Sequence, residues 1–169
     1  MDTYECIATK LDFAEFGPNE VSPEIVRKVL DAGRLTGSGN NMQHWRFILV
    51  HDPQNLKTLA ADSTSGKWVA IANFAVIILT NPKLGFHLID AGRAAQDMQL
   101  AAWNYGIASR IFTGIDKSAL QKDFGIPSDL QPSAVLGFGY PARKILGKKK
   151  RKPLTEIAFS EKYGQAIRL

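Results

Sequence analysis

The sequence has few of the residues that build disulfide frameworks or metal centres. Its 169 residues include one cysteine, Cys6, so no intramolecular disulfide can form. The three histidines, at positions 44, 51 and 87, lack the spacing of a metal-binding motif. We therefore predict neither a disulfide scaffold nor a metal site. Cys6 is interpreted as a small buried hydrophobic residue, with a reactive thiol as the weaker alternative.

Long apolar runs are also absent. The longest one, Phe74 to Leu79, is far shorter than the ~20 residues that cross a bilayer, and the first ten residues have no basic segment followed by an apolar core. These absences favour a soluble, cytoplasmic protein that does not associate with membranes. With 45% hydrophobic and 22% charged residues, the composition is that of an ordinary globular chain, and its length suits a single domain over residues 1–169.

The positive charge is not spread over the sequence. The net charge is +5, but the segment from Ala142 to Lys152 carries seven basic residues and no acidic one, and outside it 14 basic residues face 16 acidic ones. A local site or tail is therefore indicated, rather than a basic domain face. Composition alone leaves three interpretations open, a phosphate site, a solvated tail and a nucleic-acid patch, although the segment has no interleaved aromatic residues for base stacking.

Helix signals are clear in two places, and residues 2–10 are compatible with a third, short helix. Ser22 is a good N-cap and Pro23 fits the first helical position, so a helix begins there and its periodic apolar residues predict one buried face. A longer helix is predicted from His87 to Tyr105, ended by Gly106. Its apolar residues fall on several faces, so we expect it to be packed on more than one side, partly by a second subunit.

Strand-like segments alternate with these helices. Trp45 to Asp52 and Phe74 to Thr80 are rich in β-branched and aromatic residues and are predicted to be central strands of one sheet. Ile107 to Asp116 is predicted to be a strand or an extended loop, and Ser133 to Pro141 another strand. A short helix lies between them, in Lys117 to Pro127. This order predicts an α+β or α/β layered domain.

The loop before the first strand is unusually polar. Between Gly37 and Phe47 it reads GSGNNMQHWRF, and taken alone these residues favour an ordinary helix-to-strand turn over a binding site. Within it, His44 is interpreted as a turn residue with local hydrogen bonds, and a place in a pocket is the weaker alternative. Further along, Asp90 and Arg93 are three residues apart on the long helix and are interpreted as an intrahelical pair.

Read with its neighbours, this loop resembles the Pro-Ser-x-x-Asn-x-Gln-Pro-Trp element of the nitroreductase family of flavin-dependent oxidoreductases. Four residues match in type and spacing and two replace the prolines: Ser38, Asn41, Gln43 and Trp45 match, whereas Gly37 and His44 are replacements. The long helix, the GYP end of the last strand and the KKKRKPLTEIAF segment also resemble the family. The matches run in the same order from about Val21 to Phe159.

The resemblance implies a fold and a function. The fold is α+β, a three-layer α-β-α sandwich around a central mixed, mostly antiparallel sheet. The function is that of a homodimeric enzyme with FMN at the subunit interface. NAD(P)H would deliver a hydride to the flavin, which would then reduce a quinone, nitroaromatic or similar small acceptor by a ping-pong mechanism. Two alternatives stay open: a flavin-fold binding module without redox activity, and a nucleic-acid binder acting through residues 143–152.

The resemblance also assigns site residues. It places Ser38, Asn41 and Gln43 on the ribityl chain and ring edge of FMN. A backbone N–H of the catalytic segment Thr113–Gly114 would lie near flavin N5, with two apolar side chains, Ile111 and Phe112, against the ring. A glycine suits this position because a main-chain donor must approach a flat ring closely.

The basic segment 142–152 acquires a role from the same resemblance. Lys149 and Arg151 would bind the FMN phosphate as charge-assisted donors. Near the N-terminus, Lys10 and Asp12 stand where the family usually has arginine and serine. Lys10 supplies charge without the bidentate geometry of arginine, and Asp12 adds an acid beside an anion, so we expect FMN binding to be weakened or FMN placement to be altered.

Overall fold

The four predicted strands pair into one sheet in the computed structural model, which describes residues 1–168. The sheet order is β1-β2-β4-β3, and each of these pairs is antiparallel. The strands are β1 (Arg46–Val50), β2 (Phe74–Thr80), β3 (Ala108–Phe112) and β4 (Gln131–Gly139). The sheet is therefore antiparallel and not mixed. Within residues 1–168, parallel pairing is limited to one isolated bridge between Asp12 and Ser109.

The position of β1 differs from the prediction. It was expected to be a central strand, but it forms one edge of the sheet, next to β2 alone. Its exposure pattern agrees, since Arg46 and Leu49 are exposed, whereas every residue of β2 is buried. An aromatic and β-branched composition predicts a strand, but the neighbours of that strand are set by distant parts of the chain.

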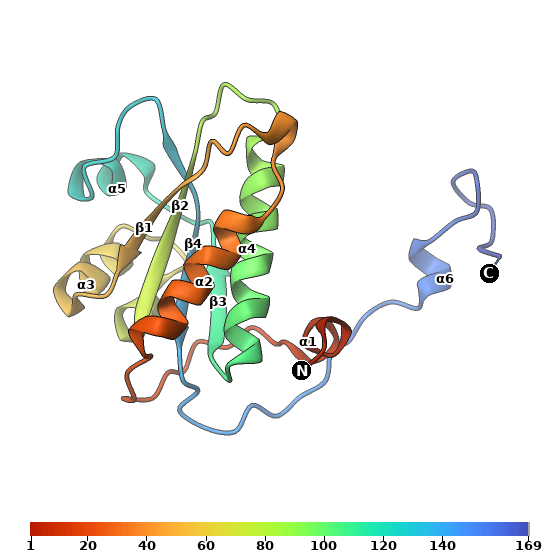
Figure 1. Ribbon diagram of the computed structural model, residues 1–169, viewed down its shortest axis with the longest axis horizontal. Helices are drawn as coiled ribbons and strands as arrows, with labels where there is room; N and C mark the ends of the chain where they lie inside the picture. The colour runs from red at the N-terminus through yellow and green to blue at the C-terminus, as the bar shows by residue number, and fades with distance from the viewer. Residues whose placement is uncertain (169) are drawn as a thin grey trace.

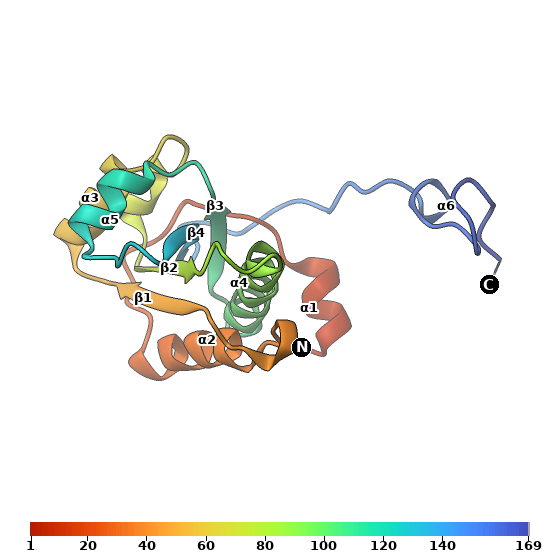
Figure 2. The ribbon, with the colours of Figure 1, turned by 90° about the horizontal axis from the view of Figure 1, so that it is seen from above.

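Helices cover both faces of the sheet and complete the three layers (Figures 1 and 2). One face carries α2 (Pro23–Leu35) and α4 (His87–Asn104), and the other carries α3 (Pro53–Ala61), the short 3-10 helix η2 (Lys67–Ile71) and α5 (Lys117–Asp123). Alternate residues of β2 enter two separate apolar clusters: Val76 and Ile78 face α2 and α4, and Ala75 and Ile77 face the other layer. Burial on both faces explains the unbroken apolar run of this strand.

Local signals in the sequence set the helix ends. The Ser22 side chain accepts a hydrogen bond from the Ile25 amide at 3.4 Å, with Pro23 as the first helical residue of α2. Gly106 follows α4 with a φ of 74°, a left-handed conformation that suits glycine. The short helix α1 (Thr3–Thr9) packs beside α4, where the Trp103 indole N–H donates to the Thr9 hydroxyl at 3.0 Å.

The chain leaves this body after β4. Residues 142–151 run past the N-terminal segment, and α6 (Leu154–Ile157) with the residues after it lies apart from the sheet and its helices (Figures 1 and 2). We call residues 142–168 the C-terminal arm. Several of its large apolar side chains are exposed, notably Leu146, Leu154, Ile157 and Tyr163, whereas Ile145 packs against the core. None of the helices in residues 1–168 is both long enough and apolar enough to span a membrane.

Candidate functional site

A groove of ≈ 290 Å³ beside α4 brings the N-terminal segment and the first part of the C-terminal arm together. The N-terminal segment, α4, β3 and the C-terminal arm all contribute to it. Its lining residues are Lys10, Leu11, Asp12, Gly92, Ala95, Gln96, Gln99, Ile111, Lys149 and Arg151. Because three of them are cations, we call it the cationic groove. Five of the predicted site residues are in this set: Lys10, Asp12, Ile111, Lys149 and Arg151.

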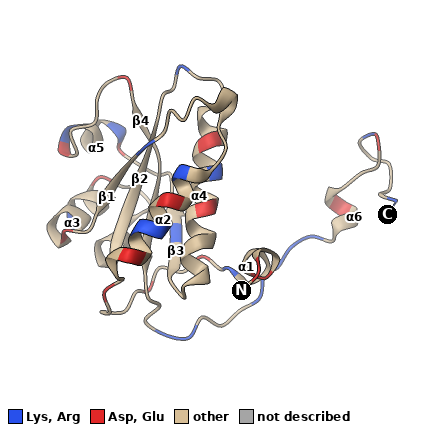
Figure 3. Cartoon of the chain, in the orientation of Figure 1, with Lys and Arg blue, Asp and Glu red and all other residues tan. Residues whose placement is uncertain are grey.

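Contacts with the N-terminal segment hold the arm in place. Arg143 donates two hydrogen bonds to the Glu15 carboxylate, at 2.8 and 2.7 Å. Further along, the Lys149 ammonium donates to the backbone carbonyl of Ile7. Figure 3 shows the Lys and Arg residues of the arm passing close to α1 and the N-terminus. The basic segment is thus attached to the body at Arg143 and Lys149, of which Lys149 is half-buried.

The charges in the groove are unbalanced. Lys10 is buried, with 7% of its surface exposed, and pairs with Asp12. The pKa of Lys149 is lowered, first by burial and then by the nearby positive charges of Arg151 and Lys10, while Asp12 acts in the opposite direction. A depressed lysine pKa means that the surroundings disfavour the charged form. One carboxylate does not neutralise three cations, so the groove favours a bound anion.

The helical wall of the groove is open at one position. A Cβ atom added to Gly92 would have no neighbour within 4 Å, so the helix backbone faces free space there. Close by, the buried Gln99 side chain donates from Nε2 to the Ser109 hydroxyl at 3.1 Å and to Asp12 Oδ1 at 3.4 Å. These contacts tie α4, β3 and the N-terminal segment together.

Several lining residues were not predicted, namely Leu11, Gly92, Ala95, Gln96 and Gln99. One of them had a signal in the sequence. Glycine inside a long helix costs about 1 kcal/mol relative to alanine, so Gly92 stands out in the sequence as a position with a reason beyond helix formation. The others have no such signal, because Ala and Gln are common anywhere in a helix.

The polar loop 38–43 lies elsewhere, at the N-terminal end of α4 (Figure 1). None of the predicted residues Ser38, Asn41 and Gln43 lines the cationic groove. The Ser38 hydroxyl accepts a hydrogen bond from the Gln43 amide at 3.0 Å, and the Gln43 side chain donates to Asn41 Oδ1 at 3.2 Å. Asn41 and Gln43 are exposed. Within one chain, therefore, the two halves of the predicted site do not meet.

The end of β3 separates the other predicted residues. Ile111 faces α4 and the groove, whereas Phe112 points to the opposite face of the sheet, where its ring meets Trp68 edge-on at 5.5 Å. Successive side chains of a strand point to opposite faces of the sheet, so Ile111 and Phe112 cannot lie on the same face. Thr113 and Gly114 follow directly, and the Gly114 carbonyl accepts a hydrogen bond from the Thr64 amide at 2.9 Å. The Phe112 side chain thus belongs to the core and not to the groove.

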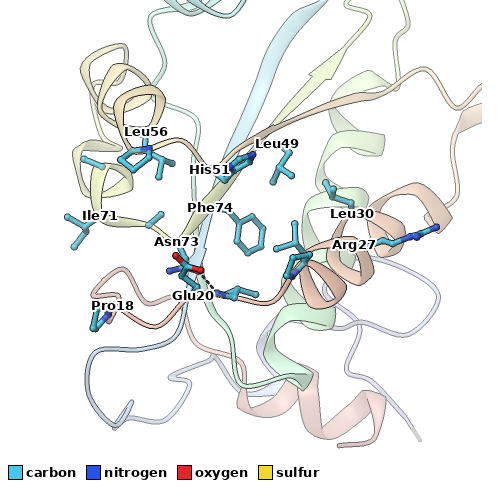
Figure 4. Close-up of a pocket in the computed structure, with 16 residues that line it drawn as sticks. Pro18, Glu20, Arg27, Leu30, Leu49, His51, Leu56, Ile71, Asn73 and Phe74 are labelled. Carbon is cyan, nitrogen blue, oxygen red and sulfur yellow. Dashed lines mark hydrogen bonds between the residues drawn. The ribbon is translucent and has the colours of Figure 1, made fainter.

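A larger cavity of ≈ 650 Å³ lies away from the groove, between α2, the end of β1 and the segment after η2 (Figure 4). Leu30, Leu49 and Phe74 contribute to its mainly apolar wall. None of the residues predicted for the site lines it. Since Arg27 is the one Lys or Arg among residues 1–168 that lines this cavity and is exposed, the cationic groove is the better anion site despite its smaller volume.

Known proteins resemble this chain in sequence and fold. The chain matches the profile of the nitroreductase family over residues 15–83 and 66–140. It is 30% identical over 145 residues to an Archaeoglobus fulgidus protein named "Putative NADH dehydrogenase/NAD(P)H nitroreductase", covering 80% of this chain and 83% of the relative. A solved structure with the same protein name, from Bacteroides thetaiotaomicron, has a TM-score of 0.87 at 24% identity, covering 94% of this chain and 96% of that one. An FMN-dependent nitroreductase structure from Clostridium difficile has a TM-score of 0.82 at 22% identity, covering 90% and 95%.

Proposed function

The chain belongs to the nitroreductase family, and from this premise we propose that it binds FMN and transfers electrons from NAD(P)H to a small acceptor such as a quinone or nitroaromatic compound. The cationic groove is the observation that carries the proposal. Its three cations have one carboxylate to balance them, and the terminal phosphate of FMN is a dianion that needs cations and N–H donors. The residues present therefore fit the phosphate end of the cofactor.

Five of the lining residues then have a role in this proposal. Lys149, Arg151 and Lys10 would bind the phosphate, with Arg151 as the single planar donor among them. Gly92 leaves the space that a flat ring or its chain requires, and Ile111 supplies an apolar contact. When bound, FMN supplies the hydride and electron transfer, so no strong acid–base pair is required of the protein. The backbone of the Thr113–Gly114 segment would donate its N–H toward the ring.

We further propose that the active unit is a homodimer with a site shared between subunits. Ser38, Asn41 and Gln43 do not reach the groove of their own chain, so in this proposal they act on the cofactor held mainly by a second copy. Two exposed apolar regions support a subunit contact: Leu88 and Ile89 on α4, 60% and 66% exposed, and the C-terminal arm. Such surfaces are costly to leave in water and are typical of interfaces.

Purified protein tests the proposal directly. We expect flavin absorption bands, either as isolated or after adding FMN, and oxidation of NADH or NADPH that depends on a quinone or nitroaromatic acceptor. Sedimentation is expected to show a dimer, which serine substitutions at Leu154 and Ile157 in the arm would weaken. Protein that takes up FMN but oxidises neither nucleotide would instead be a binding module, and protein without FMN uptake would refute the cofactor assignment.

If the chain is instead a nucleic-acid binder acting through residues 143–152, it would bind DNA or RNA with an affinity that falls steeply with salt. Neutralising the exposed cations of the arm would then abolish the binding. The same assay on the purified protein separates this alternative from the flavin proposal.

A further inference from the structure

The polar loop 38–43 has an expensive backbone conformation. Asn40, Asn41 and Gln43 have φ values of 51°, 53° and 48°, in the left-handed region that residues with a side chain rarely adopt. Three such residues within four positions require support from the surrounding structure, and strained segments of this kind gather at ligand sites. Gly39 and the preceding Gly37 do not relieve this strain, because neither has a positive φ.

Asp90 provides the support from outside the loop. It lies in the first turn of α4 and is buried, with 1% of its surface exposed. Its Oδ2 atom accepts a hydrogen bond from the Gly39 amide at 3.0 Å and contacts His44 Nε2 at 3.1 Å. These two contacts lie on either side of the strained residues. Arg93 is farther away, 3.8 Å from Oδ1, so the predicted intrahelical pair is a minor part of what Asp90 does.

The tautomer of His44 follows from its second contact. The Asn81 amide donates to His44 Nδ1 at 3.5 Å, so Nδ1 is the acceptor and the proton lies on Nε2, which donates to Asp90. The imidazole side chain is 7% exposed and meets the Phe86 ring edge-on at 5.8 Å. His44, one of the two residues that replace the family's prolines, is thus a buried link between the loop and α4.

The loop packs closely against the start of α4. A Cβ atom at Gly39 would lie 2.5 Å from the Phe86 ring, and one at Gly37 would lie 2.2 Å from an Arg93 guanidinium nitrogen. Both glycines therefore allow the backbone to touch the first two turns of α4. The carboxylate of Asp90 sits at this contact and accepts from both ends of the strained segment.

We propose that Asp90 is a positioning residue for flavin binding: its buried carboxylate, with His44, holds loop 38–43 in the conformation that presents Ser38, Asn41 and Gln43 to the cofactor. The proposal rests on the proposed function, since it requires that the loop contacts flavin. It acts on the ring and ribityl part of the ligand and not on the phosphate, which the cationic groove binds independently. Substitution of Asp90 should therefore weaken riboflavin binding as well as FMN binding, whereas substitution of the phosphate residues should weaken FMN binding alone.

The test compares the affinities for FMN and riboflavin, measured by quenching of flavin fluorescence in full-length variants. Asp90→Ala leaves two buried donors without an acceptor and is expected to weaken both ligands by the same factor, about tenfold or more. Asp90→Asn keeps an oxygen that can accept from both donors and is expected to bind each flavin within about threefold of the unsubstituted protein. The matched control is Asp31→Ala, because Asp31 pairs with Arg34 at the same spacing on α2 but has 48% of its side chain exposed.

Circular dichroism at the assay temperature checks that each variant is folded. If Asp90→Ala is unfolded, the prediction for Asp90→Asn still decides the matter, since a loss comparable to that of a phosphate-site variant would overturn the proposal. Unchanged flavin affinity in folded Asp90→Ala, or weakening of FMN alone, would overturn it while leaving the proposed function intact. If the unsubstituted protein binds neither flavin, both the proposed function and this inference are wrong.

Discussion

Removing two cations from the cationic groove should weaken FMN far more than riboflavin. In the variant carrying both Lys149→Ala and Arg151→Ala, two of the three positive charges that face the ligand are lost. Riboflavin lacks the phosphate but keeps the ring and ribityl chain, so it reports on everything except the charge contacts. The ratio of the two dissociation constants therefore isolates the phosphate site.

The size of the effect follows from the partial exposure of the groove. Lys149 is half-buried and Arg151 is exposed, so neither contact has the strength of a fully buried ion pair. Assigning about 1–1.5 kcal/mol to each charge-assisted contact gives about 2–3 kcal/mol for the pair. This corresponds to a loss of about 30- to 150-fold in FMN affinity, with riboflavin changed by less than about threefold.

Neighbouring cations of the same arm provide the control. Lys148→Ala with Lys150→Ala removes the same net charge from exposed positions that do not line the groove, and is expected to change FMN affinity only slightly at physiological salt. Fluorescence titration of FMN and riboflavin measures all of these constants. Equal weakening of both flavins, or an equal loss of FMN affinity in the control variant, would refute the assignment of the phosphate to this groove.

The pH dependence of FMN binding adds a second readout. Burial and the neighbouring cations lower the pKa of Lys149, so this side chain loses its proton at a lower pH than an ordinary lysine. A phosphate dianion favours the charged form, and FMN binding is then coupled to protonation of Lys149. FMN affinity should therefore fall as the pH rises, in a range below the ordinary lysine pKa near 10.4. This fall should be smaller in the variant without Lys149.

Three further predictions concern the groove, a buried acid and the core. Gly92→Leu fills the open space beside α4, so it should weaken the binding of both flavins about tenfold or more, as measured by fluorescence titration. The same substitution should raise helix stability by up to about 1 kcal/mol, as measured by thermal unfolding. Asp62→Asn should raise the free energy of unfolding by about 1 kcal/mol at pH 7, because Oδ2 of Asp62 is buried without a hydrogen-bond partner in residues 1–168. Burial and the charges of Asp123 and Asp116 raise the pKa of Asp62 above its ordinary value, so its charged form costs stability as the pH rises, and the gain should shrink toward about pH 4. Phe138→Ala removes a ring stacked on Phe74 at 4.7 Å and should cost about 3–5 kcal/mol in urea unfolding.

Local sequence signals predicted the elements of the fold well. The buried strand Phe74–Thr80 and the long helix beginning at His87 have the predicted bounds to within a residue or so, because capping, glycine and the apolar pattern act over a few residues. The edge position of β1 and the all-antiparallel sheet could not be obtained this way. They depend on which strands meet, and strand pairing is decided by contacts between residues far apart in sequence.

The residues of the candidate site show the same difference between what local sequence predicts and what distant contacts decide. The family resemblance named Lys10 and Lys149, and the structure places them in one groove from opposite ends of the chain. It also named Phe112, whose ring lies on the other face of the sheet, because a motif match carries no information on which way a strand residue points. His44 was interpreted as a turn residue with local contacts, yet its partner Asp90 is 46 residues away. Polar residues with a distant buried partner are the ones that spacing alone misassigns.

The polar groups of loop 38–43 are balanced, whereas the charges of the cationic groove are not. This difference decides how each half of the proposed site depends on the cofactor. The hydrogen bonds that hold loop 38–43 require no ligand, because Asp90 accepts those that the loop backbone and His44 donate. In contrast, the cationic groove has like charges close together. Burial lowers the pKa of Lys149, the charges of Arg151 and Lys10 lower it further, and this repulsion between cations opposes docking of the arm on the N-terminal segment. A bound phosphate would relieve it. Binding of FMN should therefore stabilise the contact between arm and body more than the loop, and FMN should protect the arm from proteolysis while riboflavin does not.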